Sequence, residues 1–168
     1  RFFYNLFVAL FPFFIRVASI WNPKAALWVN GRKNQFRRLQ QAIDSSPKPI
    51  IWFHSASLGE FEQGRPVIER IKSTYPSYRI LLTFFSPSGY EVRKNYSGAD
   101  IVFYLPMDSK KNARLFVKIT KPKAQFLSNT HDAEFRNSIG RGRGFTSVGR
   151  GQDCDIRGVG RGFERLKM

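Results

Sequence analysis

Hydrophobic positions follow two different periods in the middle of the chain. Four short apolar runs predict buried strands at residues 50–54, 79–85, 101–105 and 123–127. Between them, apolar positions at helical spacing predict helices at residues 60–74, 88–96 and 109–120. This alternation predicts an α/β fold over residues 50–127, with a parallel sheet, right-handed crossovers and helices on both faces.

The N-terminal segment is almost wholly apolar from Phe2 to Ile15, is interrupted by Arg16, and becomes apolar again as far as Trp21. A membrane-spanning helix needs about 20 apolar residues. This segment reaches that length only by including Arg16, and it also contains Pro12. Residues 1–21 are therefore expected to form a short membrane anchor or an interfacial helix. A buried N-terminal helix is the alternative, whereas a cleaved signal peptide would need a small-residue cleavage site that is missing here.

Residues 22–49 predict a basic amphipathic helix followed by a linker. Asn22 and Pro23 form a typical helix start, and apolar positions alternate with Arg and Lys as far as Ile43. Beside an apolar anchor, such a helix would bind an anionic membrane surface. A solvated charged face is an equally ordinary interpretation.

The charge of the chain narrows the choice of partner. Among 168 residues, 28 Lys and Arg stand against 12 Asp and Glu, a formal net charge of +16. An anionic partner is expected: nucleic acid, acidic lipid or a phosphorylated substrate. Cys154 is the single cysteine and there are two histidines, so neither a disulfide framework nor a metal site is predicted.

Three loops follow the predicted strands, after residues 54, 85 and 105, and the first two contain candidate site residues. Ligands of parallel sheets bind at this edge of the sheet. The first loop leads into a helix through Ser57, Gly59 and Glu60, and Glu60 places a carboxylate in the first turn. Acidic residues are also common there simply because they complement the helix dipole. The second loop contains three further candidates, which could bind a sugar or phosphate or serve only as helix caps: Ser86, Ser88 and Gly89.

Known catalytic fingerprints are missing from these loops. The first strand is followed neither by a hydrolase Gly-x-Ser-x-Gly elbow nor by a Walker lysine motif or Gly-x-Gly-x-x-Gly. The residues alone therefore indicate a polar, anionic ligand and fix no reaction.

Three sequence blocks resemble the N-terminal domain of the 3-deoxy-D-manno-octulosonic acid (Kdo) transferases. They are IIWFHSASLGEFEQGRPVIERIKSTYP, ILLTFFSPSGYE and VFYLPMD, and the preceding anchor and Asn-Gly-Arg segment are similar as well. The resemblance covers residues 2–127. It implies a Rossmann-like domain, the N-terminal half of a GT-B glycosyltransferase with a membrane-associated N-terminal helix.

The resemblance also implies an activity. The family transfers Kdo from CMP-Kdo to a lipid A precursor at the cytoplasmic face of the bacterial inner membrane, during lipopolysaccharide synthesis. The N-terminal domain holds the acceptor, and the Glu of the Ser-x-Gly-Glu element, here Glu60, is the general base. A phosphorylated lipid acceptor agrees with the basic charge, and neither a cofactor nor a nucleic-acid partner is expected on this interpretation.

Residues 128–168 depart from the family. They contain eight of the 13 glycines, mostly beside arginine, and no apolar periodicity. The family continues instead with an acidic Glu-x-Glu-x-Trp-Pro-like segment and a CMP-binding domain, and Glu134 lacks that motif. We therefore expect an irregular tail of out-of-frame or fused sequence, and a truncated chain that is inactive alone. The alternative is a non-enzymatic basic module that binds membrane or RNA through the Gly-Arg tail.

Overall fold

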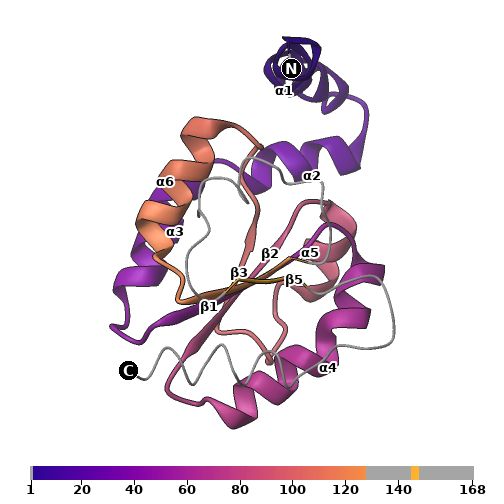
Figure 1. Ribbon diagram of the computed structural model, residues 1–168. Coiled ribbons are helices and arrows are strands. Elements are labelled where there is room, and N and C mark those ends of the chain that lie inside the picture. Colours follow the sequence, from indigo (N-terminus) through magenta and orange to yellow (C-terminus); the bar gives the residue numbers. More distant parts are fainter. Residues whose placement is uncertain (1, 128–144, 148–168) are drawn as a thin grey trace.

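The computed structural model describes residues 2–127 and 145–147 and shows a parallel sheet flanked by helices (Figure 1). The five strands are β1 (Ile50–Ser55), β2 (Arg79–Phe84), β3 (Ile101–Tyr104), β4 (Ala124–Leu127) and β5 (Phe145–Ser147). The helices of this part of the chain are α1 (Phe2–Ala18), α2 (Pro23–Gly31), α3 (Gln35–Asp44), α4 (Leu58–Thr74), α5 (Pro87–Arg93) and α6 (Lys110–Thr120).

The sheet has the order β3-β2-β1-β4-β5, and every neighbouring pair is parallel. Helices α4 and α5 cover one face, where Phe61, Ile68 and Phe84 belong to one buried cluster. Helices α3 and α6 cover the other, where Leu39, Trp52 and Phe116 form a second cluster (Figure 1). The expected α/β, Rossmann-like arrangement is therefore confirmed.

The strands and helices predicted from periodicity between residues 50 and 127 are present with small changes at their ends. Three helix starts are fixed by a serine whose side-chain oxygen accepts a backbone N–H two or three residues inside the helix: Ser57, Ser86 and Ser109. These caps place α4, α5 and α6 directly after β1, β2 and β3, with short loops between.

The single amphipathic helix expected after Asn22 is wrong, because two helices form there instead. The chain turns at Asn34, which has a left-handed backbone with φ of 52° and separates α2 from α3. The apolar face of α3 packs in the core through Leu39, so this face is not available to a membrane. The basic side chains of Arg37 and Arg38 remain exposed.

Helix α1 stands apart from the sheet and lies against α2 (Figure 1). Six large apolar side chains of α1 and the following turn are 40–77% exposed: Leu10, Phe13, Phe14, Val17, Ile20 and Trp21. This exposure contradicts the alternative of a buried N-terminal helix over these positions. Among the described residues, no helix combines the length and apolar character that crossing a membrane requires.

The tail is not irregular throughout. Residues Phe145–Ser147 form β5, which pairs in parallel with β4 in the register Gln125↔Phe145 to Leu127↔Ser147. The expectation of an irregular tail is therefore wrong at these three residues. The remainder of the tail, including Glu134, Cys154 and the Gly-Arg runs, lies outside the described residues.

Candidate functional site

The carboxyl ends of β1, β2 and β3 define one edge of the sheet. The strand order reverses direction between β1 and β4, and open α/β sheets bind ligands at such a switch point. The loop from β1 into α4 starts at this point. Ser57 caps α4 at the end of this loop, and Gly59 and Glu60 lie in the first turn of the helix.

The start of α4 resembles a capping box, but the Glu60 carboxylate accepts the N–H of Ala56, one residue before the cap residue Ser57. The Ser57 hydroxyl oxygen accepts the backbone N–H of Glu60 at 3.4 Å, and Glu60 Oε2 accepts the backbone N–H of Ala56 at 2.7 Å. The carboxylate is therefore folded back over the helix start, where the dipole favours negative charge. Glu60 itself is half-buried.

The two candidate glycines differ in their surroundings. Gly59 is exposed, and a Cβ added there would meet nothing within 4 Å, so the surface at Gly59 is open. Gly89 is buried, and a Cβ there would overlap the ring of Phe84. Packing against Phe84 therefore explains Gly89 without any ligand.

The loop after β2 is joined to the loop after β1. Ser86 N–H donates to the carbonyl oxygen of Ala56 at 3.1 Å. The Ser86 hydroxyl accepts the N–H of Gly89 at 3.4 Å and lies 2.9 Å from the exposed Ser88 hydroxyl. The structure therefore places Ser86 and Ser88 close together, where Ser86 serves as the cap of α5.

The sequence alone did not predict that α2 and the turn after it contribute residues to the site. The guanidinium of Arg32 donates to the backbone of the loops after β2 and β3, and burial lowers the pKa of Arg32 to about 9. The pKa of Tyr104 is raised, mainly because burial disfavours its charged form and also because its hydroxyl lies beside the Glu91 carboxylate. The Tyr104 hydroxyl donates to Glu91 Oε1 at 3.2 Å. The Asn-Gly-Arg segment was the available sequence signal, but its contacts with distant strands were not predictable.

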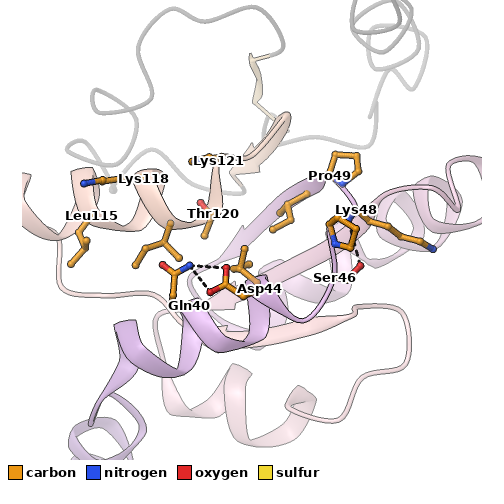
Figure 2. A pocket seen from close by; sticks show the side chains of 13 residues that line it. Gln40, Asp44, Ser46, Lys48, Pro49, Leu115, Lys118, Thr120 and Lys121 are labelled. Carbon is orange, nitrogen blue, oxygen red and sulfur yellow. Dashed lines mark hydrogen bonds between the residues drawn. The ribbon is translucent and has the colours of Figure 1, made fainter.

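A separate cavity of about 780 Å³ lies at the opposite end of the sheet (Figure 2). It lies between the ends of α3 and α6, next to the start of β1, and none of the predicted site residues lines it. Two of the three lysines that line it, Lys48 and Lys118, extend in opposite directions (Figure 2). Gln40 is hydrogen-bonded to Asp44 (Figure 2). These lysines therefore do not form a common anion site.

Metal-binding side chains do not gather anywhere in the described part of the chain. No group of three or more His, Cys, Asp or Glu residues within it is arranged to hold an ion. His54 lies inside the sheet, where its Nδ1 is 3.0 Å from the Thr83 carbonyl oxygen.

The parallel sheet and the helices on both its faces define a Rossmann-like α/β domain. The sequence model of the family described as 3-deoxy-D-manno-octulosonic-acid transferase (kdotransferase) matches residues 30–131. The chain belongs to this Kdo transferase family, which confirms the resemblance found in the sequence.

Three curated relatives carry the same description. The 3-deoxy-D-manno-octulosonic acid transferase of Aquifex aeolicus is 38% identical over 78 residues, 46% of this chain and 21% of the relative. The transferase of Chlamydia muridarum is 36% identical over 83 residues, which are 48% of this chain and 19% of the relative. A mitochondrial protein of Arabidopsis thaliana, described as a probable 3-deoxy-D-manno-octulosonic acid transferase, is 33% identical over 79 residues. These residues are 46% of this chain and 18% of the relative. The matched segments span about a fifth of these relatives' lengths.

Proposed function

We propose that this chain forms the acceptor-binding half of a GT-B Kdo transferase. In this proposal, the enzyme moves Kdo from CMP-Kdo to a lipid A precursor during lipopolysaccharide synthesis. The observation that carries the proposal is the Glu60 carboxylate, which is held by Ala56 N–H at the switch point, one residue after the exposed Gly59. Family membership supplies the reaction class.

Glu60 is proposed as the general base of an inverting transfer. The acceptor hydroxyl attacks the anomeric carbon of Kdo as CMP leaves, and its proton passes to the Glu60 carboxylate. The bond from Ala56 N–H fixes one carboxylate oxygen, so little reorganisation is needed when the hydroxyl arrives. Ser57 and Gly59 are proposed to contact the acceptor beside Glu60. Ser86 and Ser88 are proposed to contact it from the loop after β2.

The proposed location is the cytoplasmic face of the bacterial inner membrane. Exposed apolar side chains on α1, together with Arg16 and Lys24, favour an anionic bilayer in which a lipid acceptor is dissolved. The alternative of an RNA-binding module rests on residues outside the described ones, and family membership does not favour it.

Acceptor binding and proton transfer are tested separately with Glu60→Gln. The full chain is mixed with phosphatidylcholine vesicles that contain either lipid A precursor or phosphatidylglycerol at equal charge, and bound protein is measured by co-sedimentation. We expect a preference for the precursor in both the unaltered chain and the variant, because the amide keeps the shape of the carboxylate.

Transfer is then measured with CMP-Kdo, with the product identified by mass spectrometry. Removal of a general base is expected to lower any transfer about 10²- to 10⁴-fold in Glu60→Gln. Equal binding of both vesicle types by the unaltered chain would overturn the acceptor proposal. Transfer undiminished by the substitution would overturn the role of Glu60.

A further inference from the structure

One half-buried cation, Arg32, connects α2 to the candidate site. The Arg32 guanidinium donates through Nη2 to Phe85 O at 2.8 Å, through Nε to Leu105 O at 3.1 Å and through Nη1 to Trp28 O at 3.2 Å. Phe85 directly follows β2 and Leu105 directly follows β3. A single side chain therefore bridges one helix and two strand ends.

The surroundings of this guanidinium are aromatic rather than acidic. Its central carbon lies 3.9 Å from the ring centre of Trp28, 4.7 Å from that of Tyr104 and 5.3 Å from that of Phe85. Its charge is balanced by ring faces and carbonyl dipoles, since no carboxylate of the described residues pairs with it. The lowered pKa reflects this burial, and the group still carries its charge at neutral pH.

Two neighbouring residues tighten the same junction. Gly31 lies against Tyr104 so closely that a Cβ would overlap its ring, and Gln35 Nε2 donates to the Tyr104 carbonyl oxygen. Gly31, Arg32 and Gln35 thus hold the end of β3 from one turn of the chain. A lysine at position 32 could not donate to three carbonyls in this planar arrangement.

Hydrogen bonds continue from Arg32 to Glu60. Arg32 holds Phe85 O, the next residue Ser86 donates its N–H to Ala56 O at 3.1 Å, and Ala56 N–H donates to Glu60 Oε2 at 2.7 Å. The first and last steps join a side chain to the backbone of a loop, and the middle step joins the backbones of the two loops. The position of the Glu60 carboxylate therefore depends on where Arg32 holds the loop after β2.

We propose that Arg32 is a positioning residue of the acceptor site, which sets the Glu60 loop through Phe85, Ser86 and Ala56. This inference rests on the proposed function, because the acceptor must bind beside Glu60. It assigns Arg32 a role in acceptor recognition that does not require contact with the acceptor.

The first readout is the amide signal of Ala56 in the ¹⁵N–¹H spectrum of the full chain. Arg32→Lys and Arg32→Met are compared with Arg37→Met, which removes the same charge from an exposed position on α3. Both Arg32 variants are expected to shift the Ala56 signal, whereas Arg37→Met leaves it in place. Glu60→Gln is the positive control, since it removes the carboxylate that accepts this N–H.

The second readout is acceptor binding to the two vesicle types described above. A misplaced loop is expected to raise the Kd for lipid A precursor vesicles on the order of tenfold in both Arg32 variants. Binding to phosphatidylglycerol vesicles is expected to stay unchanged. A role limited to overall stability would lower the melting temperature without changing this ratio in the folded protein.

The outcomes separate the two proposals. An unaltered Ala56 signal or an unaltered vesicle ratio in Arg32→Lys overturns the positioning role while leaving the acceptor proposal intact. No preference in the unaltered chain overturns both. If the Arg32 variants do not fold, Ser86→Pro breaks the middle link by removing the N–H that donates to Ala56 O, with Ser86→Ala as the control that keeps it. The Ala56 amide signal is then the readout, and an equal position of this signal in the two variants would also overturn the positioning role.

Discussion

Gly59 and Gly89 have opposite surroundings beside the candidate site. Replacing Gly89 with alanine forces a methyl group into the Phe84 ring and is expected to cost about 1–3 kcal/mol of stability. Gly59→Ala places its methyl in open space, so folding is expected to be unchanged or improved by about 0.4–1 kcal/mol. Urea unfolding of the two variants measures this difference.

The same pair of variants tests which glycine serves the acceptor. The methyl of Gly59→Ala occupies space beside Glu60, so weaker binding to lipid A precursor vesicles is expected despite normal stability. Folded Gly89→Ala is expected to keep its preference for the precursor. Normal precursor binding by Gly59→Ala would remove Gly59 from the acceptor site.

The sequence predicts the position of these loops at the edge of the sheet, but it does not separate residues that could bind a ligand from residues that only pack. Ser57 and Glu60 follow a strand and precede a helix, and the chain order alone predicts that they lie at the carboxyl edge. Gly89 satisfied the same pattern, but its neighbour Phe84 was not visible from spacing. The contacts of Arg32 could not be predicted, because its partner Leu105 lies 73 positions away along the chain.

At the scale of elements, apolar periodicity predicted the strands and the helices between residues 50 and 127. It failed between α2 and α3, since Phe36 and Leu39 continue a plausible helical pattern. What ends the pattern is the left-handed backbone at Asn34, together with the contact of Gly31 with Tyr104. The contact of Gly31 comes from packing against β3, so apolar spacing does not encode it.

The turn at Asn34 can be tested directly. A left-handed backbone costs an ordinary side chain about 1–2 kcal/mol, and a β-branched side chain is especially unsuited to it. Asn34→Val is therefore expected to lower the free energy of unfolding by about that amount. Asn34→Gly should retain stability, and Asn30→Val, on the exposed face of α2, is the matched control. Equal losses in the two valine variants would show that the backbone at position 34 carries no special cost.

At the scale of the whole molecule, the apolar surface and the candidate site lie at one end. Helix α1 packs on α2 through Phe11 and Trp28, whose ring centres are 5.5 Å apart. Trp28 in turn lies 6.3 Å from Phe85, beside the loop after β2. A bilayer bound by α1 would therefore lie near the loops proposed to hold its lipid, and far from the cavity at the other end of the sheet.

This arrangement predicts two distinguishable kinds of binding defect. Phe13 and Phe14 are 62% and 61% exposed, and burying a phenylalanine in apolar surroundings contributes about 1.5–3 kcal/mol. Replacing both with serine is expected to weaken co-sedimentation with both vesicle types by at least about tenfold, because each factor of ten corresponds to about 1.4 kcal/mol.

The matched control is Leu115→Ser, which removes a partly exposed apolar side chain beside the cavity and should leave vesicle binding unchanged. Loss of binding to both vesicle types in the phenylalanine variant, together with selective loss in Arg32→Lys, would separate bilayer attachment by α1 from acceptor recognition at the sheet edge. Undiminished binding by the phenylalanine variant would mean that the exposed face of α1 does not contact the membrane. The basic side chains of α2 and α3 would then be the next surface to alter, because attraction to an anionic bilayer needs no apolar contact.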